Sequence, residues 1–216
     1  MPKILLTGFE PFGGEKINPS WKAVSALGGT SISGWDIIAA EIPVVRYVSM
    51  DLIKELIREH QPEIIISVGQ AGGRMEISLE RIGINVDDYG IPDNGGNQPI
   101  DEPIDAAGPP AYFSTLPVKA MVQAMRASGV PAIVSNTAGT YLCNHIAYAL
   151  PHYLAVENIK AIGGFIHIPF LPEQAATQRG RPSMALESLI TGLKAGITAA
   201  IDHRENDLKL QGGVTH

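Results

Sequence analysis

Short apolar runs, bounded by glycine, proline or polar residues, recur along the whole chain. Runs of this length with these boundaries predict buried β-strands. Six strands are expected, at residues 3–7, 37–44, 63–68, 77–86, 130–135 and 161–168. Because such apolar strands are typical of sheets buried on both faces, the pattern indicates helices on either side of one sheet.

Between these strands, apolar positions recur every three or four residues, which is the spacing of an amphipathic helix. Ser49 is a suitable N-cap for a helix that buries Ile53 and Ile57. Two more helices are expected at residues 118–128 and from Pro182 onward. The alternation of strands and helices predicts the α/β class, as a three-layer α/β/α sandwich with a central, largely parallel twisted sheet.

Residues 87–111 break this alternation with prolines, glycines and acidic side chains in no regular period. Long loops in compact domains are often lids or binding loops, although a surface excursion without a function has the same composition. A chain of 216 residues suits one domain, and we expect residues 1–216 to form it. A polar C-terminal tail is expected from about residue 203.

Composition and charge restrict the partners. The formal net charge of -6 disfavours a nucleic acid or an anionic membrane surface, because both attract clustered Lys and Arg. No apolar run is long enough for a membrane span or a signal-peptide core. We therefore expect a cytoplasmic protein with a small or peptidic ligand.

Candidate chemistry gathers in four segments that follow predicted strands. In open α/β sheets, ligands bind beyond the carboxyl ends of the strands. The segments are TGFEPFGG from Thr7, VGQAGGR from Val68, SNTAGTYLCN from Ser135 and GFIHIPF from Gly164. Their glycine turns lack the lysine of a phosphate-binding loop and the spacing of a dinucleotide-binding loop, so no cofactor is expected.

Cys143 is the single cysteine, so it forms no disulfide within the chain. It opens an apolar stretch that resembles a helix, and a helix N-terminus stabilises a thiolate. Judged alone, the residue is more typical of a structural cysteine buried in the core. His145 lies two positions further on, which would direct it to another side of the helix.

His167, near the end of the strand at 161–168, is the preferred base for a cysteine nucleophile, although a core histidine is the alternative. No second His or Cys stands at a metal-ligand spacing from it, so no metal is expected. Glu80 shares the alternating face of Ile82 and Ile84 and would orient the imidazole. A shift of one residue would instead place Glu80 in solvent.

Two long segments resemble signatures of the pyroglutamyl-peptidase I family, also called pyrrolidone carboxyl peptidases. The cysteine signature is similar to VPAIVSNTAGTYLCN from Val130, and the glutamate signature is similar to GGRMEISLERIGIN from Gly72. Three other characteristic segments also match: TGFEPFGG with the following Asn18-Pro19-Ser20, IPDNGGNQPIDEP from Ile91, and GGFIHIPFLPEQ from Gly163. The resemblance extends from Lys3 to about Ile201.

The resemblance implies a cysteine exopeptidase that removes N-terminal pyroglutamate from peptides through a thiol acyl-enzyme. It places the nucleophile on Cys143, the base on His167 and the acidic partner on Glu80. It also implies substrate contacts at Phe9, Phe12, Gln70, Ile91, Tyr141 and Leu142. The family commonly forms homo-oligomers, so a tetramer or dimer is expected.

Two positions depart from the family pattern. Tyr141 stands where many relatives have Phe, and Gly90 stands before IPDN where some have Arg. The first change alters the pocket wall, and the second removes a cation that would help to hold the loop or the reacting oxyanion. Two other functions remain open on a similar α/β scaffold: a nucleoside or sugar-phosphate transferase, and a non-catalytic small-molecule binding protein.

Overall fold

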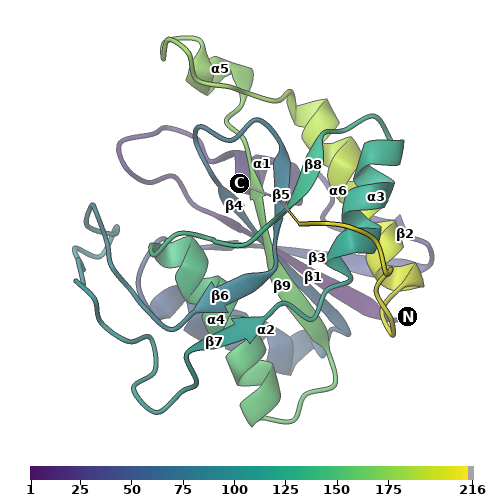
Figure 1. The fold of residues 1–216 in the computed structure, drawn as a ribbon, viewed down its shortest axis with the longest axis horizontal. Helices are drawn as coiled ribbons and strands as arrows, with labels where there is room; N and C mark the ends of the chain where they lie inside the picture. The colour runs from purple at the N-terminus through teal and green to yellow at the C-terminus, as the bar shows by residue number, and fades with distance from the viewer. Residues whose placement is uncertain (214–216) are drawn as a thin grey trace.

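The computed structural model describes residues 1–213 and centres on one mixed sheet (Figure 1). The strands are β1 (Lys3–Phe9), β2 (Ser31–Ile32), β3 (Trp35–Ile42), β4 (Ile64–Gln70), β5 (Ile77–Glu80), β8 (Ala132–Ser135) and β9 (Ile162–Ile168). They lie in the order β2-β3-β1-β4-β9-β5-β8. β3, β1, β4 and β9 are mutually parallel, whereas β5 is antiparallel to β9 and parallel to β8. The expected largely parallel sheet is confirmed.

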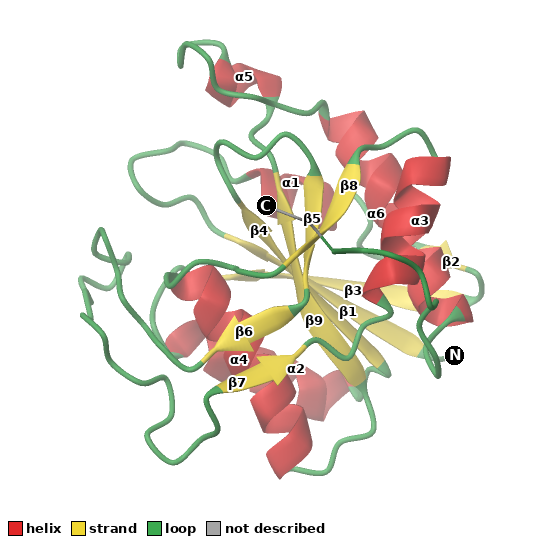
Figure 2. Ribbon diagram, viewed as in Figure 1, coloured by secondary structure: helices red, strands yellow, loops and turns green. Residues whose placement is uncertain are grey.

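Helices cover both faces of the sheet, as expected for a three-layer sandwich (Figure 2). They are α1 (Pro19–Ser25), α2 (Val48–His60), α3 (Val118–Ala127), α4 (Leu142–Val156), α5 (Pro172–Ala175) and α6 (Leu186–Asp202). α1, α3 and α6 pack on one face, and α2 and α4 pack on the other.

Alternation along each strand divides the core between these two layers, because successive side chains in a strand point to opposite faces. In β1, Ile4 and Leu6 belong to the core under α1, α3 and α6. Leu5 belongs to the core under α2 and α4, together with Phe165 of β9. Both faces are apolar, which explains why the strands read as continuous apolar runs rather than as alternating ones.

The strand predicted at residues 77–86 is wrong as a single element. The chain leaves the main sheet after Glu80 and continues as β6 (Ile82–Ile84), which pairs with β7 (Ala111–Phe113) in a separate two-stranded sheet. Arg81 lies at the break and bonds through its backbone to Ser135 on one side and Ser114 on the other. Two sheets that share one apolar run cannot be distinguished by periodicity.

The last helix also begins later than expected, at Leu186 rather than at Pro182. Ser183 instead forms an isolated bridge with Phe170, and Met184 N–H donates to the Phe170 carbonyl. This pairing holds the backbone extended through the residues that precede the helix. The short elements α1, α5, β2 and β7 were not expected from the pattern.

Beyond α6, residues 203–213 of the expected polar tail lie against the body of the molecule, and residues 214–216 are outside the described part. Asp207 accepts hydrogen bonds from the backbone N–H groups of Lys119 and Ala120, at the start of α3. The Arg81 guanidinium donates to the Gly212 carbonyl. Within residues 1–213, the helices are too short or too polar to cross a membrane.

Candidate active site

The candidate site lies where the parallel strands β1, β4 and β9 reach their carboxyl ends. Phe9 ends β1, Gln70 ends β4, and His167 is the penultimate residue of β9. Cys143 occupies the first turn of α4, as expected, because the helix begins at Leu142. The cysteine segment reaches this edge through the turn at 136–141, since β8 runs antiparallel to β9.

Cys143 and His167 both lie beside Gly69. In the register of β4 and β9, Gly69 pairs with His167, so any side chain at 69 would share the face of the imidazole. A Cβ atom built at Gly69 would lie 2.9 Å from Cys143 Sγ and 2.6 Å from the Phe165 ring. Only glycine leaves room at this position, and its absent side chain lets the thiol lie over the strand, on the face that carries His167.

Glu80 orients the imidazole, and it does so from an antiparallel neighbour. Glu80 pairs with Phe165 across β5 and β9, which makes His167 its diagonal neighbour on the same face. Glu80 Oε1 lies 2.7 Å from His167 Nδ1, and the glutamate is only 1% exposed. Because the carboxylate only accepts, Nδ1 carries the proton and Nε2 keeps its lone pair. The alternative in which Glu80 lies in solvent is wrong.

Arg74 completes this group, and the sequence reasoning missed it. Its Nη1 donates to Glu80 Oε1, and its Nη2 donates to the Thr137 carbonyl at 2.9 Å. The guanidinium therefore joins the buried carboxylate to the turn that leads to Cys143. Arg74 ends the segment VGQAGGR, in which the sequence analysis assigned a role to Gln70 but none to the arginine. The sequence signal that could have revealed it is a cationic residue directly after a glycine turn at the end of a predicted strand.

Burial disfavours the charged forms of Cys143 and His167. Burial, with a smaller contribution from the charge of Glu80, raises the pKa of the Cys143 thiol to about 12, although Arg74 opposes the shift. Burial also lowers the pKa of His167, although the hydrogen bond to Glu80 opposes it. A helix N-terminus contributes only about 0.3–1 kcal/mol. The expected thiolate is therefore not the favoured resting form.

A narrow aromatic slot adjoins the thiol. Its lining includes Phe9, Phe12, Gln70, Tyr141 and Leu142, which are five of the six expected substrate contacts. The Phe12 and Tyr141 rings face one another at a centroid distance of 5.9 Å and an interplanar angle of 27°. The centre of a water-sized sphere can occupy only about 10 Å³ there, so a five-membered ring enters only if an aromatic side chain moves.

The sixth expected contact, Ile91, lies outside this lining. Its side chain is 46% exposed, and its Cδ1 lies 3.7 Å from a Cβ built at Gly13, in the loop after β1. The slot includes Asn18 and Val44 instead. Asn18 is occupied as the N-cap of α1, where it accepts from Ser20, so it shapes the slot through the helix start.

The loop at residues 87–111 covers this region and is fixed at both sides. Asp93 accepts hydrogen bonds from the backbone of Arg46 and from its own turn, and the Tyr141 hydroxyl donates to the Pro92 carbonyl at 3.3 Å. Asp87, at the loop start, is fully buried against Arg46 Nε and His145 Nδ1. His145 therefore belongs to the loop anchor rather than to Cys143, in agreement with its predicted direction.

Gly90 lies in this loop with open space around it, since a Cβ built there meets no atom within 4 Å. The loop is held by pairings on either side, including Asp88 N–H to Thr140 and Tyr89 N–H to Pro99. The cation that some relatives carry at this position is thus not needed to fix the loop here.

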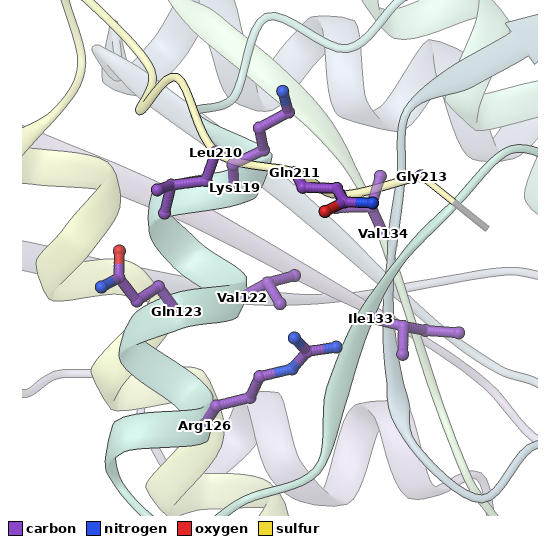
Figure 3. A pocket seen from close by; sticks show the side chains of 10 residues that line it. Lys119, Val122, Gln123, Arg126, Ile133, Val134, Leu210, Gln211 and Gly213 are labelled. Atoms are coloured by element: carbon purple, nitrogen blue, oxygen red, sulfur yellow. The ribbon is translucent and has the colours of Figure 1, made fainter. Parts of the chain in front are cut away.

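A second hollow, of about 390 Å³, lies between α3, β8 and the tail (Figure 3). Arg126 points toward it, but its Nε already donates to the Ala132 carbonyl. None of the expected site residues lines it. Within residues 1–213, there is no group of three His, Cys, Asp or Glu side chains arranged to hold a metal ion.

Comparison with known proteins relates the whole length of the chain to one family. The family model described as pyroglutamyl peptidase matches residues 2–203. A pyrrolidone-carboxylate peptidase of Cupriavidus taiwanensis is 55% identical over 217 residues, covering all of both chains. One of Bacillus cytotoxicus is 51% identical, again over the whole of both chains.

Solved structures agree in fold as well. The crystal structure of pyroglutamyl peptidase I from Bacillus amyloliquefaciens superposes with a TM-score of 0.93 at 46% identity, covering 96% of this chain and 100% of that chain. The pyrrolidone carboxyl peptidase of Thermococcus litoralis gives 0.94 at 36% identity, covering 98% and 100%. This chain therefore belongs to the pyroglutamyl peptidase family of cysteine-type hydrolases.

Proposed function

We propose that this chain removes N-terminal pyroglutamate from peptides, with Cys143 as nucleophile, His167 as general base and acid, and Glu80 as the group that orients the imidazole. The observation that supports this most directly is the meeting of all three at one sheet edge. Cys143 Sγ lies over Gly69, the strand partner of His167, and Glu80 binds the far side of the imidazole.

The neutral resting pair sets the order of proton transfers. His167 Nε2 takes the thiol proton as Cys143 Sγ bonds to the pyroglutamyl carbonyl carbon, and the carbonyl electron pair moves to oxygen. The imidazolium then gives that proton to the leaving amine as the C–N bond breaks. Water attacks the resulting thioester with His167 as base, which releases pyroglutamate and restores the thiol. Glu80 stabilises the imidazolium in both steps.

Backbone N–H groups at the start of α4 suit the developing oxyanion. The first N–H groups of a helix have no partner within the helix, and the N-cap residue Tyr141 supplies no side-chain hydrogen bond to them. Cys143 lies among these groups, so its own N–H is near the reacting carbon. In other hydrolases, loss of one such donor typically costs about 2.7–4 kcal/mol of transition-state stabilisation.

The slot suits a neutral lactam, which offers one donor and one acceptor on a flat ring. The pairing of β1 with β4 ends at Gly8 and Val68, and the next N–H of β1, that of Phe9, donates to Ser20 Oγ instead. Residue 11 is proline and has no N–H. The Gln70 carbonyl is therefore left to accept from the lactam N–H, while Phe12 and Tyr141 cover the ring faces.

The test is release of fluorophore from pyroglutamyl-aminomethylcoumarin by the wild type and by Cys143→Ala, beside a prolyl substrate that lacks the lactam carbonyl. We expect cleavage of the pyroglutamyl substrate alone and a loss of more than about a thousandfold in the variant. A folded wild type without activity would favour the binding-protein alternative. Phosphate-dependent turnover that survives loss of Cys143 would favour a transferase.

Three further properties form part of the proposal: the chain acts as one domain, in the cytoplasm, as a homo-oligomer. Exposed apolar side chains on the β6–β7 sheet, Ile84 and Phe113, support association. The family resemblance favours a tetramer or dimer. Light scattering that detects only a 23.0 kDa species would contradict the oligomer.

A further inference from the structure

Gln70, at the end of β4, lies between the aromatic slot and a short chain of hydrogen bonds behind it. Its Oε1 accepts from Gln174 Nε2 at 2.9 Å. Gln174 belongs to α5, the short helix that follows β9, and is only 5% exposed. A buried glutamine with both ends bonded has one permitted orientation, and that orientation decides which end of Gln70 faces the slot.

Two independent partners fix the orientation of the Gln174 amide. The backbone N–H of Leu171 can only donate, and it donates to Gln174 Oε1 at 3.1 Å. The carboxylate of Glu15 can only accept, and its Oε2 lies 3.3 Å from Gln174 Nε2. Each partner alone would turn the amide nitrogen toward Gln70, so Gln70 must offer its oxygen in return. Its own Nε2 is then the end left for the slot.

The three segments joined in this way each follow a strand that ends at the site. Glu15 lies in the loop after β1, Gln70 ends β4, and Gln174 follows β9. These hydrogen bonds therefore connect the Glu15 carboxylate, outside the slot, through Gln174 to the Gln70 amide at the slot wall. The backbone N–H of Leu171 and the carboxylate of Glu15 are the two fixed ends of this chain.

We propose that Gln174 is a positioning residue for substrate recognition: it holds Gln70 with Nε2 as a hydrogen-bond donor to the lactam carbonyl oxygen. The proposal rests on the proposed peptidase function. With the Gln70 backbone carbonyl accepting the lactam N–H, one residue then serves both polar groups of the ring. A site built to bond both groups rejects rings that lack either one, because a slot group is left unpaired.

The decisive variant is Gln174→Glu. Its carboxylate still accepts from Leu171, but its second oxygen also accepts, so Gln70 turns its nitrogen away from the slot and presents its oxygen. We expect KM for pyroglutamyl-aminomethylcoumarin to rise at least about tenfold, with kcat within about twofold, because the lost contact binds substrate rather than the reacting atoms.

Two small inhibitors report which end of the Gln70 amide faces the slot. 2-Pyrrolidone carries the ring carbonyl, which is an acceptor, and 2-iminopyrrolidine carries a donor in the same place. The wild type should bind 2-pyrrolidone more tightly than 2-iminopyrrolidine. In Gln174→Glu, the ratio of the two inhibition constants should reverse or shrink at least about tenfold. A loss of packing would weaken both inhibitors together and leave their ratio unchanged.

Gln178→Glu is the matched control. Gln178 Nε2 also contacts Glu15, at 3.3 Å from Oε1, so this variant adds the same charge beside the same carboxylate without touching Gln70. Its KM and inhibitor ratio should equal those of the wild type. If the ratio shifts equally in both variants, added charge rather than orientation is the cause, and the proposal is wrong.

If Gln174→Glu does not fold, Gln174→Met replaces it, since the side chain is of similar size and uncharged. Gln70 then loses its orienting donor, and we expect a raised KM and a narrowed inhibitor ratio. An unchanged KM and ratio in either folded variant would overturn the proposal. A wild type that does not cleave pyroglutamyl-aminomethylcoumarin would instead overturn the proposed function, so the two failures are distinguishable.

Discussion

At the scale of single residues, the site depends on one small side chain and one buried carboxylate. Gly69 admits the thiol over β4, and Glu80 fixes the proton of His167 on Nδ1. Burial disfavours the ionic forms of both Cys143 and His167, so the proposed base is neutral before substrate binds. In the proposed mechanism, the thiol gives up its proton only when the carbonyl carbon is in place.

This arrangement predicts the dependence of activity on pH. His167 must be neutral to accept the thiol proton, and burial lowers its pKa, so kcat/KM should fall only at pH values below the ordinary histidine pKa of about 6.5. Alkylation of Cys143 by iodoacetamide should keep rising above pH 9, because burial raises the pKa of its thiol to about 12. Rate profiles from pH 4 to about 11, beside free glutathione, measure both limbs.

If the fall of kcat/KM at low pH has its midpoint above the ordinary histidine pKa, His167 is charged in the resting protein. A fast alkylation rate that is constant through neutral pH would show a preformed thiolate. Either result would contradict the neutral pair and would require the order of proton transfers to be reversed.

At the scale of secondary-structure elements, periodicity located most helices but not the boundaries between sheets. α3 lies within a residue of its predicted bounds, because it buries one apolar face. The predicted N-cap of α2, Ser49, is wrong: the N-cap is Tyr47, and Ser49 lies in the first turn of the helix. The run at residues 77–86 divides at Arg81 between two sheets, so Glu80 does not share one continuous face with Ile82. Glu80 nevertheless contacts His167 Nδ1, through pairing with β9 that alternation along one strand cannot reveal.

The loop at residues 87–111 offers a prediction at this scale. Tyr141→Phe removes the hydrogen bond to the Pro92 carbonyl and keeps the ring that faces Phe12. We expect faster hydrogen exchange in the loop near Pro92 and a KM raised about two- to tenfold, because one neutral hydrogen bond contributes about 0.5–1.5 kcal/mol. Exchange mass spectrometry and steady-state kinetics measure the two effects.

Tyr148→Phe is the matched control, since the Tyr148 hydroxyl donates to the Pro109 carbonyl at the far end of the same loop. Its exchange should change near Pro109 while KM stays at the wild-type value. Equal effects of both variants on KM would mean that the loop acts as one rigid body, and that Tyr141 has no special role over the slot.

At the scale of the whole molecule, segments far apart in the sequence supply one another's missing partners. The start of α3 has no side-chain cap of its own, and Asp207 of the tail accepts from two of its free N–H groups. The tail then continues to Gly212, which accepts from Arg81, the residue after Glu80. The tail thus stabilises a helix and the edge of the sheet without entering the site.

Removal of this cap should destabilise the protein without affecting catalysis. Asp207→Ala should lower the free energy of unfolding by about 1 kcal/mol. Asp207→Asn should recover only part of this loss, because Asn has one acceptor oxygen for the two N–H groups that the carboxylate binds with separate oxygens. Urea denaturation measures the stability, and kcat/KM should stay unchanged in both. Equal stability of wild type and Asp207→Ala would show that the tail contact contributes nothing.

The sequence by itself determined the α/β class, the layered arrangement and the identity of the residues that meet, because apolar periodicity and local motifs are properties of neighbouring positions. Cys143 at a helix start and His167 at a strand end follow from such local pattern. Only the tertiary structure decided that β5 runs antiparallel to β9, which brings Glu80 diagonally opposite His167. It also decided that Arg74 and Gln174 reach Glu80 and Gln70, since contacts between distant segments depend on strand order and register, which no local pattern encodes.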